Sequence, residues 1–255
     1  MPTAAGLYYF AYGEEELERT PVILIHGAGG THLHWPPEIR RLPEQRIFAI
    51  DLPGHGKSEG VGKQSIQEYA QVVFDFMDEK YLPSATIVGH SMGSAIAMTM
   101  ALTTPDRVLA LGLIGSGGRL RVAPSILENA SSEATFPLAI KMIHDSAFGP
   151  SANPRLRELA AQRMSEIRPT VLHGDFIACN EFDVIEELPM INIPTLIVCG
   201  KEDKMTPLRY SQLLGESISN AELVVIDGAG HMVMLEEPHQ VADALVNFFS
   251  KIKNK

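Results

Sequence analysis

The sequence is poor in cysteine, in positive charge and in long apolar runs, and each shortage excludes a class of protein. Two cysteines, Cys179 and Cys199, are too few for a disulfide framework, and their spacing matches no metal-binding motif. The 21 Lys and Arg residues are outnumbered by 31 Asp and Glu residues, which gives a formal net charge of −10. Because so acidic a chain repels phosphate on average, nucleic acid and anionic membrane surfaces are not expected as partners.

The chain also lacks the signals that direct a protein into or across a membrane. No apolar run approaches the roughly 18 residues that a membrane-spanning helix needs. Residues 1–6 show no basic segment followed by an apolar core, so no secretory signal is expected. With only two cysteines, these absences predict a cytoplasmic location. The 255 residues, 45% of them hydrophobic, suffice for one large globular domain or for a domain with an insertion.

Short apolar runs alternate with helical patterns along most of the chain. The apolar runs lie at 22–25, 47–50, 85–88, 109–114, 195–199 and 223–226, and a more amphipathic one lies at 7–12. Short runs that are apolar on both faces and end at Gly, Asp or His favour buried parallel strands, whereas 7–12 suits an outer antiparallel strand. The alternation predicts an α/β fold with a mostly parallel sheet flanked by helices.

Two helices and one insertion complete this organisation. A capping box at 65–68 precedes an apolar stripe at helical spacing, and 238–252 carries a second stripe behind Pro238. Between 116 and 190 no strand-like run appears, and helical fragments are separated by prolines. We expect a core formed by 1–115 and 191–255, with 116–190 inserted as a helical segment over one end of the sheet.

Residues 89–93 read Gly-His-Ser-Met-Gly and carry the strongest chemical signal. They follow an expected strand and precede a helix rich in small residues. In this context the pattern G-x-S-x-G indicates a nucleophilic serine on a sharp turn. Glycine is needed on both sides because a side chain there would collide across so tight a turn. The pattern predicts Ser91 as a nucleophile exposed at the carboxyl end of the sheet, near a helix N-terminus.

A serine hydroxyl is a weak nucleophile and needs a base that is itself oriented by an acid. Asp203 lies just beyond the strand at 195–199, and His231 lies just beyond the strand at 223–226. In a parallel sheet these loops and the Ser91 turn share one edge, where ligands bind. We therefore predict Ser91, His231 and Asp203 as nucleophile, base and orienting acid.

The first buried strand ends in residues 26–30, which read His-Gly-Ala-Gly-Gly. Small residues there leave main-chain N–H groups free to face a substrate. We predict that the N–H groups of Ala28 and Met92 form an oxyanion hole, with Gly29 as the second choice for Ala28.

Together these segments resemble the α/β-hydrolase superfamily of esterases and lipases over essentially the whole chain. The matching pieces are His26-Gly27, residues 51–58, the Ser91 turn, residues 200–203 with Pro207, and Gly230-His231 with Glu237-Pro238. The resemblance implies Ser91, Asp203 and His231 as the catalytic triad, Ala28 and Met92 as the oxyanion hole, and 116–190 as a helical cap.

The resemblance and its departures predict a serine carboxylesterase that acts on small to medium, mostly apolar carboxylic esters. Ser91 in place of Asp argues against the dehalogenase and epoxide hydrolase branches, and Met232 stands where carbon–carbon bond hydrolases usually have Trp. A lactonase, a carbon–carbon bond hydrolase or a perhydrolase on the same triad stays open, as does a ligand-sensing protein without activity. The oligomeric state is left open.

Neither a metal nor an organic cofactor is expected, and the partner is a small-molecule ester. His26, His32 and His34 lie close together in sequence but have no neighbouring carboxylate in their loop, so they are not predicted to bind metal. Four residues are candidates for the substrate pocket: Gly29, Phe136, Met142 and Met232. Arg119 and Arg121 lie at the start of the insertion. Whether either of them binds an acidic substrate is left open.

Overall fold

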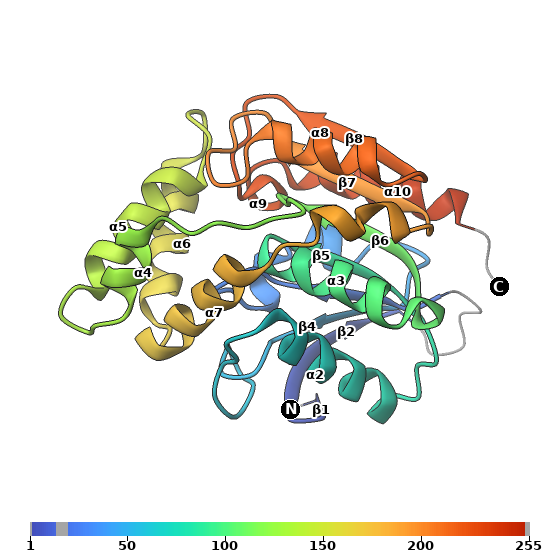
Figure 1. Ribbon diagram of the computed structural model, residues 1–255, viewed down its shortest axis with the longest axis horizontal. Coiled ribbons are helices and arrows are strands. Elements are labelled where there is room, and N and C mark those ends of the chain that lie inside the picture. Colours follow the sequence, from blue (N-terminus) through green and yellow to red (C-terminus); the bar gives the residue numbers. More distant parts are fainter. Residues whose placement is uncertain (1, 14–19, 253–255) are drawn as a thin grey trace.

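The computed structural model describes residues 2–13 and 20–252, which form an eight-stranded sheet between two layers of helices (Figure 1). The strands are β1 (Thr3–Ala4), β2 (Leu7–Tyr12), β3 (Val22–Ile25), β4 (Ile47–Ile50), β5 (Ala85–His90), β6 (Val108–Ile114), β7 (Thr195–Gly200) and β8 (Ala221–Ile226). Their order across the sheet is β1-β2-β4-β3-β5-β6-β7-β8. Strands β3 to β8 pair in parallel, and β2 pairs antiparallel with β1 and β4.

The predicted strands are confirmed in position, but β8, expected to be buried on both faces, is the edge strand of the sheet, and only Ile226 in it is buried. Every residue of β3, β4 and β5 is buried, as expected for strands covered on both faces. The amphipathic run at 7–12 is the antiparallel strand β2, with Tyr9 opposite Ile50 of β4. The short strand β1 lies outside it and was not expected from the sequence.

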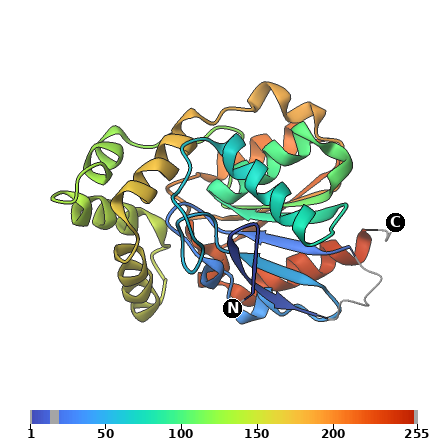
Figure 2. The same ribbon diagram turned by 90° about the horizontal axis from the view of Figure 1, so that it is seen from below.

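Helices cover the two faces of the sheet unequally (Figure 2). α2 (Ile66–Glu79), α3 (Met92–Thr103) and α8 (Leu208–Ser217) cover one face, and α1 (Pro37–Arg40) and α10 (Pro238–Lys251) cover the other. Ser65 caps α2, because its hydroxyl accepts a hydrogen bond from the N–H of Glu68 over 3.2 Å and donates one of 3.0 Å to the Glu68 carboxylate. Short helical turns are η1 (His32–His34), η2 (Pro105–Arg107) and α9 (Val233–Glu236).

Between β6 and β7 the chain forms an insertion made of α4 (Pro124–Ala130), α5 (Phe136–Ala147), α6 (Pro154–Ser165), α7 (Pro169–Glu181) and η3 (Ile185–Met190). Helices α4 to α6 stand beyond one end of the sheet (Figure 1). They share an apolar cluster with α7 that includes Phe136, Ile140 and Phe176. The last turn of α7 instead joins the main core through Ala178 and Cys179, so the insertion is anchored to the core at its C-terminal side.

No helix within 2–13 and 20–252 is long and apolar enough to cross a membrane. In the same ranges, no group of three or more His, Cys, Asp or Glu side chains is placed to hold a metal ion.

Candidate active site

Ser91 occupies a strained turn between β5 and α3. Its backbone has φ 52° and ψ −114°, in the positive-φ region that a residue with a side chain rarely adopts. The strain is held by tight packing on both sides of the turn. A Cβ added to Gly89 would collide with the main chain of Gly93, and one added to Gly93 would collide with the carbonyl oxygen of Ile25. The two glycines of the motif are therefore required by the close approach of main chains.

His231 and Asp203 meet at the same edge of the sheet as Ser91. Nδ1 of His231 lies 2.9 Å from Oδ2 of Asp203, and both side chains are buried. The Thr206 hydroxyl donates a further hydrogen bond of 2.8 Å to Oδ2 of Asp203. Burial alone would raise the pKa of Asp203, but the charge of His231 and these hydrogen bonds outweigh it and lower that pKa. The arrangement can hold a histidine ring in one orientation beside an ionised carboxylate.

Two further side chains fix the loop that carries His231. Nε2 of His90 donates a hydrogen bond to the carbonyl oxygen of His231 over 3.0 Å, and the two rings are 4.8 Å apart. The Glu236 carboxylate accepts hydrogen bonds from the N–H of Gly230 at 2.9 Å and from the N–H of Gly149 in the insertion at 2.8 Å. The histidine loop is thus tied both to the serine turn and to the end of α5.

The loop after β3 presents Ala28 to the same cavity. The carbonyl oxygen of Gly27 accepts hydrogen bonds from Nδ1 of His26 at 2.8 Å and from the N–H of Gly30 at 3.0 Å. Because a trans peptide points its N–H away from its C=O, these two bonds also fix the direction of the Ala28 N–H. Met92 is the first residue of α3, and its N–H has no carbonyl partner within the helix.

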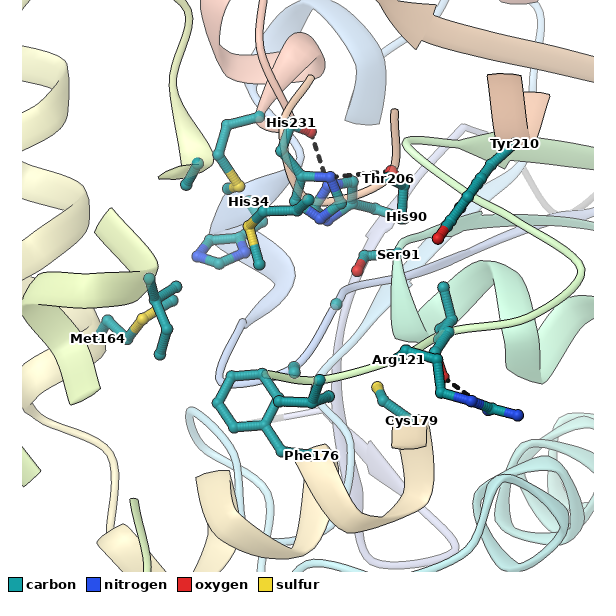
Figure 3. A pocket seen from close by; sticks show the side chains of 18 residues that line it. His34, His90, Ser91, Arg121, Met164, Phe176, Cys179, Thr206, Tyr210 and His231 are labelled. Atoms are coloured by element: carbon teal, nitrogen blue, oxygen red, sulfur yellow. Dashed lines mark hydrogen bonds between the residues drawn. The ribbon is translucent and has the colours of Figure 1, made fainter. Parts of the chain in front are cut away.

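Ala28, Ser91 and His231 line one pocket with a cavity volume of about 80 Å³ (Figure 3). Ser91 and the ring of His231 face this cavity, and Met164 and Phe176 of the insertion lie across from them. The wall is mainly apolar and includes Leu120, Val122, Ile143, Ala147, Met164, Phe176, Met205 and Met232. Its polar side chains include His34, His90, Arg121, Thr206 and Tyr210, and Gly27 and Ala28 also border it.

Comparison with known proteins identifies the family. A family model described as "Alpha/beta hydrolase family" matches residues 22–244. The chain belongs to the α/β-hydrolase family. A solved thermophilic esterase is 34% identical to this chain, with a TM-score of 0.82. The match covers 96% of this chain and 98% of the esterase chain.

Among curated relatives of this α/β-hydrolase, the named activities differ. A 2-hydroxymuconate semialdehyde hydrolase of Pseudomonas putida is 30% identical over 92% of this chain and 88% of its own length. A putative carbamate hydrolase RutD of Caulobacter sp. (strain K31) is 29% identical over 97% of both chains. The names of these relatives thus agree on hydrolysis and differ in the substrate.

Of the four residues predicted for the substrate pocket, one lines it and three do not. Met232 lines the pocket beside His231, whereas Gly29, Phe136 and Met142 do not. Phe136 is turned into the apolar cluster of the insertion, and Met142 is half-buried on another side of α5 from Ile143 and Ala147, which do line the pocket. The N–H of Gly29 donates to Asp175 at 2.8 Å, so it is not free to serve in place of Ala28.

Arg119 and Arg121 are held by the insertion. The Arg121 guanidinium donates to the carbonyl oxygens of Asn180 at 2.8 Å and Phe182 at 3.2 Å, and it pairs with Asp183 at 3.2 Å. Arg119 pairs with the same Asp183 at 2.6 Å. In Figure 3 the charged end of Arg121 points away from Ser91, although its stem borders the pocket. Neither arginine thus presents a free charge to a substrate beside the serine.

Several side chains of this site were not expected from the sequence, namely His34, His90, Asp175, Thr206 and Glu236. Thr206 carries a recognisable signal, because a hydroxyl three residues after an Asp commonly closes a local side-chain turn. Glu236 and Asp175 have no such signal, since Glu236 joins its own loop to Gly149, 87 positions away, and Asp175 binds Gly29, 146 positions away. Burial, followed by the charge of Arg163, lowers the pKa of His34 to about 4, so its ring is neutral near pH 7.

Proposed function

We propose that this α/β-hydrolase is a serine carboxylesterase for small to medium, mostly apolar carboxylic esters. The observation that carries the proposal is the 2.9 Å contact between His231 and Asp203 in the same pocket as the strained Ser91. A hydroxyl at such a turn is exposed to substrate on one side and open to a base on the other. The relative with the highest identity among those compared above is an esterase, which agrees with this chemistry.

Acylation follows from the positions of these groups. His231 accepts the Ser91 proton at Nε2 while the serine oxygen attacks the ester carbonyl carbon. Asp203 keeps Nδ1 of His231 protonated and stabilises the imidazolium that forms. The N–H groups of Ala28 and Met92 stabilise the negative charge on the carbonyl oxygen of the tetrahedral intermediate. The imidazolium then gives its proton to the departing alkoxide, which leaves as the alcohol.

Deacylation repeats these steps with water in place of serine. His231 takes a proton from a water molecule, the resulting nucleophile attacks the acyl carbon, and the proton returns to Ser91 as the acid leaves. Every proton transfer in this cycle uses His231, and no step calls for a metal or an organic cofactor.

The pocket wall supports an apolar acyl group of modest size. Ile143, Phe176 and Met232 each offer hydrocarbon or sulfur surface to the cavity, and the volume of about 80 Å³ suits a short acyl chain. Because the Arg121 charge is bound elsewhere, an acyl group that ends in a carboxylate gains no ion pair there. A cytoplasmic location is part of this proposal.

A carbon–carbon bond hydrolase is the second candidate, because a relative of that named kind is 30% identical. The residue after His231 favours the ester reaction, since the Met232 side chain has no N–H or O–H group with which to orient a polar dienoate. Lactones and peracid formation use the same triad and are therefore tested beside the esters.

The decisive experiment combines labelling with a substrate panel. A fluorophosphonate probe should label Ser91 in the wild-type protein, and mass spectrometry should find the adduct on that residue. Ser91→Ala should lose on the order of 10⁶ in kcat toward p-nitrophenyl acetate and butyrate, with an unchanged far-ultraviolet circular dichroism spectrum. Turnover of a vinylogous 1,5-diketone in preference to all esters and lactones would overturn the esterase assignment. A folded Ser91→Ala protein with wild-type turnover would overturn the triad itself.

A further inference from the structure

A buried carboxylate in the insertion touches the loop of the proposed oxyanion hole. Asp175 lies on α7 with no solvent exposure. Its Oδ2 accepts hydrogen bonds of 2.8 Å from the N–H of Gly29 and from Nε2 of His55, and its Oδ1 accepts one of 2.5 Å from the Tyr69 hydroxyl. One side chain of the insertion thus joins three parts of the core.

The partner His55 has both ring nitrogens on acceptors. Nδ1 lies 3.0 Å from the carbonyl oxygen of Pro53, which can only accept, and Nε2 lies on the Asp175 carboxylate. Burial by itself lowers the pKa of His55, but the charge of Asp175, its hydrogen bond and the bond to Pro53 outweigh burial and raise that pKa. An acceptor at each ring nitrogen favours a protonated imidazole beside this buried carboxylate, and the hydrogen-bonding groups of both side chains have named partners.

Asp175 holds the peptide next to the one that faces the cavity. The Ala28 N–H is directed by the two hydrogen bonds on the Gly27 carbonyl oxygen. The following peptide carries the Gly29 N–H, which Asp175 binds, and Gly29 adopts a positive φ of 64°. Because glycine is conformationally permissive, this peptide would lose one of the bonds that hold its orientation if its N–H had no fixed acceptor.

We propose that Asp175 is a positioning residue for the oxyanion hole, which makes the stabilisation of the tetrahedral intermediate depend on the docking of α7. The proposal rests on the function proposed above, in which the Ala28 N–H binds the oxyanion. Asp175 does not touch substrate, since it does not line the catalytic pocket. It acts through Gly29, from a segment that is 146 positions away in the chain.

A purely structural role predicts a different result, and Tyr69 supplies the matched control. Tyr69→Phe removes a hydrogen bond to the other oxygen of the same carboxylate and leaves the bond to Gly29 in place. If Asp175 only stabilises the fold, its substitution and Tyr69→Phe should affect turnover alike at equal loss of stability. If Asp175 positions the loop, the two should differ in kcat.

The test compares three proteins with the wild type. Asp175→Asn keeps a carbonyl acceptor for Gly29 without the charge. Asp175→Ala is combined with His55→Gln, so that no buried cation is left alone. Tyr69→Phe is the control. The measurements are kcat and KM toward p-nitrophenyl butyrate, thermal stability, and inhibition by an alkyl trifluoromethyl ketone, whose adduct with Ser91 places an oxyanion in the hole.

We expect the double variant to lose about 100-fold in kcat and a similar factor in trifluoromethyl ketone affinity, with KM within about threefold. Asp175→Asn should recover to within about tenfold of wild type, because its carbonyl still accepts the Gly29 N–H, and its remaining loss should again appear in kcat and inhibitor affinity. Tyr69→Phe should lower stability with kcat within about threefold of wild type.

The inference is wrong if kcat and inhibitor affinity of the Asp175 variants match those of Tyr69→Phe, or if their loss appears only in KM. Should the double variant fail to fold, the comparison of Asp175→Asn with Tyr69→Phe still decides the matter by the same two measurements. A wild-type enzyme that the trifluoromethyl ketone does not inhibit would instead contradict the proposed function.

Discussion

Thr206 donates a hydrogen bond of 2.8 Å from its hydroxyl to the same Asp203 oxygen that Nδ1 of His231 approaches at 2.9 Å. The second oxygen of Asp203 accepts from the N–H groups of Met205 and Thr206, both at 2.8 Å. Both oxygens of the Asp203 carboxylate therefore accept hydrogen bonds from groups other than the histidine. Its orientation comes from a short local turn and does not depend on the histidine alone.

Removing the Thr206 hydroxyl should therefore weaken the support of His231. Thr206→Val keeps the shape of the side chain and removes the hydrogen bond, and we expect kcat to fall roughly tenfold, since a bond to a charged group contributes about 1.5–3 kcal/mol. Thr206→Ser keeps a hydroxyl and should stay near wild type. Steady-state kinetics on one ester checks both variants, and equal activities of Val and Ser at this position would refute the role.

Neighbouring positions on α5 should differ in their control of acyl length. Ile143 lines the pocket and Met142 does not, so Ile143→Ala should shift the preferred p-nitrophenyl ester to a chain roughly two to three carbons longer. Met142→Ala is the matched control and should leave the preference unchanged. A profile of kcat/KM from acetate to decanoate measures both. The pocket must be formed elsewhere if both variants give the same profile as wild type.

Arg121 should matter for stability and little for catalysis. Its guanidinium is about half exposed and holds the carbonyl oxygens at the end of α7. Arg121→Ala should lower the free energy of unfolding by about 0.5–1 kcal/mol, a value reduced by solvent screening. We expect kcat/KM for neutral esters and for esters of dicarboxylic acids to change by less than about threefold. A selective loss of activity on the dicarboxylic esters would show that Arg121 binds substrate.

The buried His34 should make the fold less stable in mild acid. Its pKa is about 4 in the folded protein, because of burial and the charge of Arg163, against about 6.5 for an exposed ring. Below pH 6.5 the His34 ring binds a proton in the unfolded chain, whereas in the folded chain the ring stays neutral until the pH approaches 4. The stability is therefore complete above pH 6.5 and declines as the pH falls toward 4, by about 3 kcal/mol from this residue.

Urea unfolding at pH 7 and pH 4.5 tests this prediction. His34→Gln should show a smaller loss of stability between the two pH values than the wild type. His239→Gln, at an exposed position, serves as the control and should follow the wild type. Burial also lowers the pKa of His26 and His90, so the His34 variant should keep part of the acid sensitivity. An unchanged difference between the two pH values would contradict the assignment to His34.

Local pattern was enough to predict the sheet and the serine turn. A strand buried on both faces must be apolar along its length, and a chain that turns within a few residues needs glycine where main chains touch. Both requirements restrict the residue types at neighbouring positions, as at β3 and at the turn of Ser91. The order of Ser91, Asp203 and His231 could be predicted for the same reason, since each directly follows a recognisable strand.

Features that depend on neighbouring residues in the chain could therefore be predicted from the sequence. Packing between distant segments decides which face of α5 lines the pocket and which carboxylate binds Gly29. Helix rotation about its axis is set by packing against distant segments, which is why Ile143 and not Met142 lines the cavity. The bond between Gly29 and Asp175 joins residues 146 positions apart, and a buried N–H selects its acceptor by position in space.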